Sequence, residues 1–349
     1  MWIRVKQALN PILKLSVMMW LSVIAHINVA HAEVVRFEYG VNHLEGHYLS
    51  PTNDQPARAV LLFVHGDGAA PYDANGFYEL IWQPLRDRGY AIFSWDKPGV
   101  GGSSGNWLAM SMADRQGIVA AAAETIQQEY GFDASQTGVI AFSQAGWVVP
   151  ELLADTYSRI GFAVGIGFAT SWIDQGRYFT ATRLMLEGAT PEEIKAAVAN
   201  HEDEIAFFDT SPSYGAYLKR TREAPMTRDR YHFVLRNYQS DASQANWAIQ
   251  RPTLLLWGDT DFNVDATYEF AQWQERPTPW VSTKMINNAT HAMLRADLFS
   301  EPGFGMAEWL KILWLEEEAL APDFLPTLFK WLAIQTPERS FQPDMLSEQ

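Results

Sequence analysis

The stretch Gly138-Val139-Ile140-Ala141-Phe142-Ser143-Gln144-Ala145-Gly146 runs from an apolar strand into a serine and then into the helical segment Trp147 to Leu153. A strand that passes into a helix through a single serine predicts a sharp turn with a strained serine backbone. The residues two before and two after Ser143 must be small, because the strand and the helix approach each other closely there. Alanine occupies both places, as Ala141 and Ala145, where glycine is usual. One extra methyl group at each place leaves the turn buildable.

On both sides of this stretch, apolar runs alternate with helical segments, which is typical of an α/β fold with a mostly parallel sheet covered on both faces. The expected parallel strands are Ala59 to Val64, Tyr90 to Trp95, Thr137 to Phe142, Ile160 to Gly167, Thr253 to Trp257 and Trp280 to Met285. An antiparallel hairpin of Val34 to Tyr39 and Gly46 to Leu49 is expected to precede them. The expected helices are Tyr78 to Arg88, Asp114 to Glu129, Ala266 to Gln274 and Leu325 to Ile334.

The alternation stops between Ser171 and Gln250, where the sequence is helical and charged and has no buried-strand run. Thr190-Pro191-Glu192-Glu193 predicts a helix start there, with Thr190 as N-cap and Glu193 closing a capping box. Ligands of open α/β sheets bind at the carboxyl edge, where this insertion leaves and rejoins. We therefore expect residues 33–170 and 251–349 to form the core and residues 171–250 to form a helical cap.

Two later segments supply partners for the serine. The strand from Thr253 ends in Gly258-Asp259-Thr260-Asp261, and His291 lies in a loop after the next strand. A serine hydroxyl needs a base to become nucleophilic; an imidazole takes its proton, and a carboxylate fixes the tautomer of that imidazole. The candidate catalytic residues are therefore Ser143, Asp261 and His291.

Two neighbouring aspartates compete for the role of the acid. Asp261 is preferred because it lies three residues past Gly258, far enough into the loop to reach the imidazole from the side away from the serine. Asp259 is expected to bond its own backbone in the turn. Asp265 is expected to cap the helix that starts at Ala266.

The segment Val64-His65-Gly66-Asp67-Gly68 ends an early strand. Such loops supply one backbone N–H of an oxyanion hole, and the residue after the nucleophile supplies the other. We nominate the amides of Asp67 and Gln144. The Asp67 carboxylate would repel an oxyanion if it pointed inward. His65 is expected to hold the loop rather than act as a second base.

A glycine-rich run, Asp96-Lys97-Pro98-Gly99-Val100-Gly101-Gly102-Ser103-Ser104-Gly105, follows another strand. It lacks the glycine spacing and the Gly-Lys-Ser/Thr ending of phosphate-binding loops. We expect it to form a loop under the site, with Asn106 and Trp107 as candidate substrate-binding residues.

Taken together, the order of these features from Val34 to Ile334 resembles the α/β-hydrolase superfamily. The Asp-x-x-Gly-x-Gly-x-Ser and Ser-Gln-x-Gly-Trp passages resemble its bacterial esterase and serine-aminopeptidase-like branch. The resemblance implies an α/β-hydrolase fold with an eight-stranded, mostly parallel sheet flanked by helices, an inserted helical cap and no cofactor. No metal site is expected either, and the lack of cysteine excludes thiolate ligands.

The leading functional hypothesis is a serine hydrolase that cleaves a small or medium carboxylic ester through an acyl-serine intermediate. A peptidase or amidase of the same branch is the alternative, and it would need carboxylates such as Glu202, Asp203 and Glu204 to hold a substrate amine. That charge run is more typical of a solvated helix face. A non-catalytic binding protein on the same scaffold is the third hypothesis, against which the serine, aspartate and histidine positions argue.

The N-terminal residues 1–32 have the pattern of a signal peptide, with three basic residues, an apolar stretch and Ala30-His31-Ala32 as the cleavage site. Glu33 is the expected mature start and the periplasm or medium the expected location; an uncleaved anchor is the alternative. Cleavage removes three of the 26 basic residues and none of the 41 acidic ones, which leaves a net charge of about −18. A nucleic-acid partner and stable membrane insertion of the mature chain are not expected.

Overall fold

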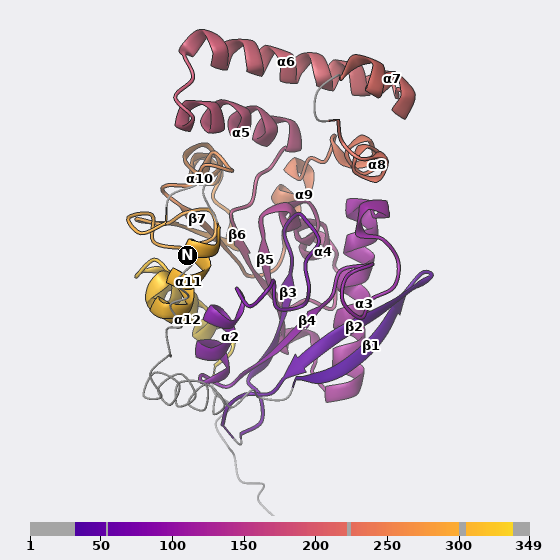
Figure 1. Ribbon diagram of the computed structural model, residues 1–349. Coiled ribbons are helices and arrows are strands. Elements are labelled where there is room, and N and C mark those ends of the chain that lie inside the picture. Colours follow the sequence, from indigo (N-terminus) through magenta and orange to yellow (C-terminus); the bar gives the residue numbers. More distant parts are fainter. Residues whose placement is uncertain (1–31, 54, 222–224, 300–304, 338–349) are drawn as a thin grey trace, which may run out of the picture. The chain divides into compact units, whose positions relative to one another are not determined.

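Eight strands form one sheet (Figure 1). They are β1 (Glu33–Tyr39), β2 (Asn42–Leu49), β3 (Ala59–Val64), β4 (Tyr90–Trp95), β5 (Thr137–Phe142), β6 (Phe162–Ile166), β7 (Thr253–Gly258) and β8 (Val281–Ile286). Their order across the sheet is β1-β2-β4-β3-β5-β6-β7-β8. The hairpin β1–β2 is antiparallel and β2 runs antiparallel to β4, whereas all other neighbours are parallel. The predicted fold class, an eight-stranded and mostly parallel sheet, is confirmed.

The computed structural model describes residues 32–53, 55–221, 225–299 and 305–337. The chain divides into two units, Met1–Ala32 and Glu33–Gln349, and every helix and strand named here belongs to the second unit. The predicted signal peptide lies outside the described residues, apart from Ala32.

The register of the parallel strands brings their carboxyl ends to one edge of the sheet. Val64 of β3 lies opposite Ala141 of β5, and Phe142 of β5 lies opposite Ile166 of β6. On the other side, Gly258 at the end of β7 lies opposite Ile286 at the end of β8. The loops that follow β3, β5, β6, β7 and β8 therefore leave the sheet close together, and all the predicted catalytic residues are in these loops.

Helices cover both faces of the sheet (Figure 1). Side chains alternate between the faces along a strand, so that Val60, Leu62 and Val64 of β3 share the core cluster that includes the buried face of α3. Phe63 points to the other face, where its ring lies 5.5 Å from that of Trp82 in α2. The flanking helices are α2 (Glu79–Arg86), α3 (Met112–Tyr130), α4 (Val149–Ala154), α10 (Ala266–Glu275), α11 (Met306–Leu315) and α12 (Phe324–Gln335), and the short 3-10 helices are η2 (Trp107–Ala109), η3 (Ala134–Gln136), η4 (Ser143–Trp147) and η5 (Glu316–Ala319).

Between β6 and β7 the described residues form five helices, which we call the α5–α9 segment. They are α5 (Trp172–Leu186), α6 (Pro191–Asp209), α7 (Tyr214–Arg220), α8 (Arg228–Asn237) and α9 (Ser243–Ala248). Figure 1 shows α5 to α8 beyond the end of the sheet at which β5 and β6 finish. The predicted start of α6 is confirmed, because Thr190 and Glu193 form a reciprocal capping box. Aromatic side chains form a small core of this segment, namely Phe208, Tyr217, Tyr231 and Tyr238.

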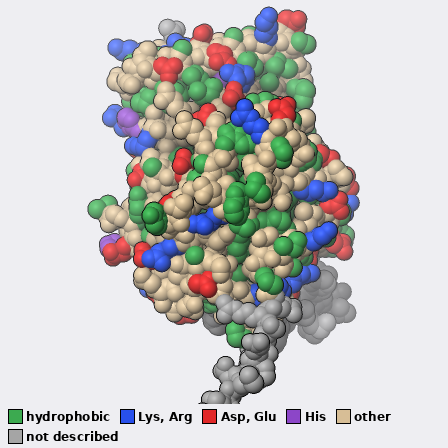
Figure 2. Space-filling view, turned by 180° about the vertical axis from the view of Figure 1, so that it is seen from behind, with side chains coloured by type: hydrophobic (Ala, Val, Ile, Leu, Met, Phe, Trp, Pro, Cys, Tyr) green, Lys and Arg blue, Asp and Glu red, His purple; other side chains and the backbone are tan. Residues whose placement is uncertain are grey.

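The charge distribution on the surface and the character of the helices both bear on possible partners. Acidic and basic side chains are interspersed over the face seen in Figure 2 rather than separated by sign. No helix in the described part of the chain combines the length and the apolar character that crossing a membrane requires.

Candidate active site

Ser143 is the first residue of η4, directly after β5, and its backbone is strained. Its φ is 51°, in the left-handed region that residues with a side chain rarely adopt. Ala141 and Ala145, the two alanines that replace the usual glycines, are fully buried. Gly66 packs against the serine from the loop after β3; a methyl group on Gly66 would lie 3.2 Å from Ser143 Cβ. The sequence thus builds the predicted turn with alanine at both small positions.

Asp261 and His291 meet at the ends of β7 and β8. His291 Nδ1 lies 2.7 Å from Asp261 Oδ2. The other carboxylate oxygen accepts the N–H groups of Asn263 and Val264, at 2.8 and 2.9 Å. The Asp261 side chain is fully buried. These bonds fix the carboxylate. Because a carboxylate only accepts hydrogen bonds, Nδ1 must carry the ring proton and donate to it, which leaves Nε2 as the nitrogen able to take up a proton.

Gly167, the residue after β6, sets the position of the imidazole. Its φ is 64°, and a methyl group there would lie 2.7 Å from His291 Cε1 and 2.9 Å from Nδ1. The ring therefore lies directly on the backbone of Gly167, between the strand end that carries Ser143 and the strand that leads to Asp261. Only a glycine at this place leaves room for the imidazole.

Asp259 has a different role from the one predicted. Its Oδ1 accepts the N–H of Ala289 at 3.2 Å and the hydroxyl of Thr260 at 3.0 Å, so the carboxylate braces the loop that carries His291 instead of bonding its own backbone. The prediction for Asp259 was wrong in that detail, because contacts with a loop about 30 residues later are not visible in a local turn pattern. Asp265 accepts the N–H of Tyr268 and caps α10, as predicted.

The loop after β3, residues 65–68, is held by buried polar side chains. His65 is buried, its Nε2 lies 2.7 Å from the Trp95 carbonyl and its Nδ1 lies 3.1 Å from the Tyr78 hydroxyl. Burial and the nearby Lys97 charge lower the pKa of His65 to about 3, so the ring is neutral. This arrangement agrees with the predicted holding role of His65.

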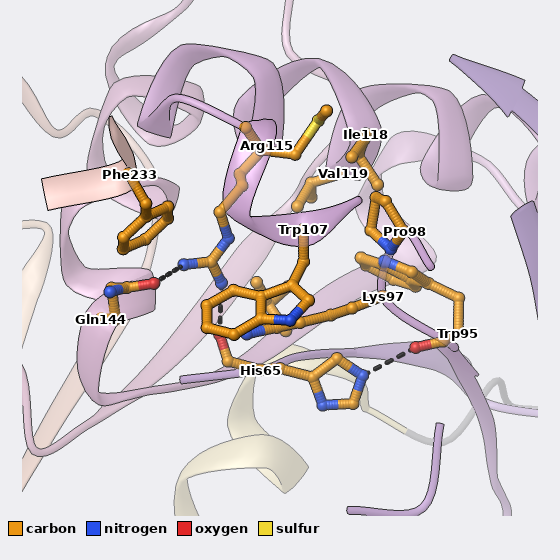
Figure 3. A pocket seen from close by; sticks show the side chains of 12 residues that line it. His65, Trp95, Lys97, Pro98, Trp107, Arg115, Ile118, Val119, Gln144 and Phe233 are labelled. Carbon is orange, nitrogen blue, oxygen red and sulfur yellow. Dashed lines mark hydrogen bonds between the residues drawn. The ribbon is translucent and has the colours of Figure 1, made fainter. Parts of the chain in front are cut away.

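Lys97 and Arg115 bind the carbonyl oxygens of the same loop. Lys97 Nζ donates to Gly66 O at 2.5 Å and to Gly68 O at 2.8 Å. The Arg115 guanidinium donates to His65 O and, at 2.6 Å, to Gln144 Oε1. Burial lowers the pKa of Arg115 to about 10, which leaves it charged at neutral pH. Figure 3 shows both side chains converging on the loop from the β4 and α3 sides.

The Asp67 carboxylate is neutralised by the α5–α9 segment. Arg230 of α8 binds it through both guanidinium nitrogens, at 2.8 and 3.1 Å, and Gln144 Nε2 donates to it at 3.1 Å. Burial opposes ionisation, but the hydrogen bond and charge of Arg230 hold the pKa of Asp67 below its ordinary value. The repulsion anticipated from the sequence is thereby offset by a partner 163 residues away.

A small, mainly apolar cavity of about 20 Å³ lies beside this loop. Trp107 and Phe233 line it with their ring centroids 5.5 Å apart, edge to face, and Figure 3 shows the Trp107 ring beside the Lys97 side chain. Trp107, one of the two predicted substrate-binding residues, lines the cavity. Asn106 is not among the lining residues; its side chain accepts the N–H of Leu108 at 3.0 Å and donates to Asp229 of α8 at 3.2 Å.

Comparison with known proteins identifies the family of the chain. The model of the alpha/beta hydrolase family matches residues 61–308, well over half of the chain. The chain belongs to the alpha/beta hydrolase family. A search of curated proteins found no match.

Solved structures share the fold of this hydrolase at low sequence identity. An esterase from Pyrococcus furiosus has a TM-score of 0.55 and 15% identity, over 96% of this chain and 97% of the esterase. A proline iminopeptidase from Mycobacterium smegmatis has a TM-score of 0.53 and 16% identity, over 87% of this chain and 99% of the iminopeptidase. A thermophilic esterase from Thermogutta terrifontis has a TM-score of 0.52 and 14% identity, over 87% and 100% of the two chains.

One group of side chains in the described part of the hydrolase has the spacing of metal ligands: Glu45, His47 and Asp96. Its carboxylates already have partners. Asp96 accepts the N–H groups of Tyr72 and Gly102, and Glu45 is paired with Arg36 at 2.7 Å. The group therefore braces the glycine-rich loop after β4.

Sequence reasoning missed four side chains of this hydrolase site: Lys97, Arg115, Tyr178 and Arg230. Tyr178 of α5 donates its hydroxyl to the Asp261 carbonyl at 3.0 Å. Lys97 lies in the motif Asp96-Lys97-Pro98-Gly99, directly after a buried strand, and that position was the one available signal. A charged residue in a loop is otherwise expected at the surface.

Proposed function

We propose that this hydrolase cleaves a carboxylic ester of a small or medium substrate through an acyl-serine intermediate, with Ser143 as nucleophile, His291 as base and Asp261 as the acid. The observation that carries the proposal is the 2.7 Å contact between His291 Nδ1 and Asp261 at the edge of the sheet where Ser143 is held at a φ of 51°. A hydrogen bond from a neutral histidine to a buried carboxylate, at the sheet edge that also carries a strained serine, is the arrangement that can make a hydroxyl nucleophilic.

In the proposed reaction, Ser143 Oγ attacks the ester carbonyl carbon while its proton passes to His291 Nε2. The carbonyl oxygen becomes an oxyanion, which the N–H groups of Asp67 and Gln144 stabilise. When the tetrahedral intermediate collapses, the bond to the alcohol breaks and His291 returns the proton to the leaving oxygen. Water then attacks the acyl-serine by the same route, releasing the acid and regenerating Ser143.

Support for an ester rather than an aminoacyl amide comes from the charge run in α6. Glu202, one of the residues that could hold a substrate amine, is paired with Arg177 at 2.5 Å and lies on the exposed side of the helix. Two of the three structural neighbours described above are named esterases, and the third is a proline iminopeptidase. The amidase remains the second candidate function.

The test is to treat residues 33–349 with a fluorophosphonate, map the labelled residue and compare turnover of p-nitrophenyl esters of increasing chain length with aminoacyl p-nitroanilides. Labelling confined to Ser143 and faster ester turnover are expected. Labelling elsewhere with Ser143 untouched would contradict the assignment, and faster anilide turnover would favour the amidase.

Export is proposed as well: the mature N-terminus should be Glu33, and an intact Met1 on membrane-bound protein would contradict it.

A further inference from the structure

The N–H group of Asp67 lies on the same peptide unit as the carbonyl of Gly66. In a trans peptide the C=O and the N–H point in opposite directions, so whatever fixes the carbonyl also fixes the N–H. Lys97 Nζ lies 2.5 Å from Gly66 O. In the described part of the chain the Asp67 N–H has no hydrogen-bond acceptor, whereas Gly66 itself packs on Ser143. Lys97 thus binds the carbonyl on one side of the Gly66–Asp67 peptide, and the Asp67 N–H points to the opposite side, away from the lysine.

Lys97 also binds the next carbonyl but one, Gly68 O, at 2.8 Å. Its side chain is only 5% exposed, so both bonds are protected from competition with water. Gly68 has a φ of 90°, which no other residue type adopts readily. Two bonds from one buried amine therefore hold the peptide that precedes Asp67 and the peptide that follows Gly68.

We infer that Lys97 is a positioning residue of the proposed hydrolase, which directs the Asp67 N–H toward the oxyanion by holding the carbonyls of Gly66 and Gly68. The inference rests on the proposed function. Lys97 does not touch the substrate's reacting atoms; it acts through the peptide that does.

The charged groups that face Lys97 come from three elements: Arg115 from α3, Asp67 from the loop after β3 and Arg230 from α8. Burial and the Arg115 charge lower the pKa of Lys97 well below its ordinary value. A neutral amine still has two N–H groups, one for each carbonyl. The positioning role therefore persists when Lys97 loses its proton.

The experiment compares Lys97→Met, which keeps the length of the side chain and removes its donors, with a matched control. Arg86→Met is that control, since Arg86 is also a buried basic residue, 6% exposed, and donates to a backbone carbonyl, Ser50 O, at 2.7 Å far from the site. Both variants lose a buried donor and should melt at a lower temperature than the wild type. Only Lys97→Met should lose kcat, on the order of 10²-fold, with KM changed less than about threefold.

Two inhibitors separate positioning from general damage. An alkylboronic acid forms a tetrahedral adduct with Ser143 that needs the oxyanion donors, whereas the product alcohol does not. In Lys97→Met the inhibition constant of the boronic acid should rise in parallel with the loss of kcat, and that of the alcohol should stay constant. If Lys97→Met does not fold, Lys97→Gln is assayed in the same way, because its shorter amide cannot reach both carbonyls.

The outcomes are distinguishable. If the wild type turns over esters and the lysine variant keeps kcat within about threefold, or loses kcat and alcohol binding equally, the inference is overturned and the proposed function stands. If the wild type neither labels at Ser143 nor turns over esters, the proposed function fails, and the inference fails with it.

Discussion

Arg230 of α8 and Asp67 of the loop after β3 form a two-pronged ion pair, with nitrogen–oxygen distances of 2.8 and 3.1 Å. The pair joins the α5–α9 segment to the peptide proposed to bind the oxyanion. Its guanidinium also lies 5.1 Å from the centre of the Phe233 ring, which lines the cavity beside the loop. The charge of Asp67, beside the proposed oxyanion site, is therefore balanced by a residue of the α5–α9 segment.

Removal of this partner should slow the reaction. Arg230→Gln leaves the Asp67 carboxylate without its cation beside a developing negative charge, and kcat should fall about tenfold. In the double variant Asp67→Asn/Arg230→Gln, kcat should recover to within about threefold of the wild type, because residue 67 no longer carries a negative charge. Arg228→Gln, on the same helix with its guanidinium over Tyr214, is the control and should be unaffected. Failure of the double variant to recover would show that charge is not the cause.

Acid should weaken the same ion pair. The folded pKa of Asp67 is lower than its ordinary value, so the stabilisation it provides is complete above the ordinary carboxyl pKa of about 3.9 and is lost as the pH falls through the folded pKa. The Asp67 side chain is 43% exposed, so we expect less than about 1 kcal/mol. Thermal unfolding measured from pH 7 to pH 3 should give the wild type a slightly higher Tm than Asp67→Asn, and this difference in Tm should close as the pH falls below about 4. A gap that widens on acidification would be inconsistent with a lowered pKa.

The two acids after β7 should differ sharply in their effect on the reaction. Asp261→Asn removes the carboxylate that accepts from His291 Nδ1 and should lower kcat by about 10³ to 10⁴ with the fold intact. Asp259→Asn removes a brace of the same loop and should cost less than about tenfold. Steady-state ester kinetics on both variants test this prediction. Losses in the opposite order would make Asp259 the acid of the triad.

Gly167 offers a test of the position of the imidazole. In Gly167→Ala the added methyl group would meet the His291 ring at 2.7 Å, so the ring must move away and kcat should fall by at least about 10². Gly131→Ala is the matched control: its φ of 75° carries the same kind of backbone strain, but no atom lies within 4 Å of the added methyl. Both variants should unfold more easily, and only the first should lose activity. Equal kcat values for the two variants would argue against a ring held at Gly167.

The centre of the sheet could be predicted closely because its strands must be apolar on both faces. β3 and β5 were expected at the bounds at which they are found, and β6 was expected two residues too early because Ile160 and Gly161 are also apolar. Helix α11 was not predicted. It is apolar on more than one face, with Leu310, Leu313 and Trp314 exposed and Ile312 buried, so it lacks the contrast between an apolar and a polar face that predicts a surface helix.

The candidate site was predictable only where a residue type and its place along the chain both indicate chemistry. Ser143, Asp261 and His291 each follow a strand, and the sheet order brings the ends of those strands together. Whether they catalyse the reaction stays a prediction. Lys97 and Arg230 could not be identified in the same way, because burial of the first and the pairing of the second with Asp67 depend on segments 31 and 163 residues distant.

The α5–α9 segment touches two different loops of the site: Tyr178 reaches the backbone of Asp261, and Arg230 reaches the side chain of Asp67. An exchange of this segment for that of another family member would therefore alter more than the shape of the substrate pocket. A chimaera without a counterpart of Arg230 would inherit an unbalanced carboxylate beside the proposed oxyanion donors. Grafting experiments on this scaffold would have to transfer the insertion and residue 67 together, as one inherited unit.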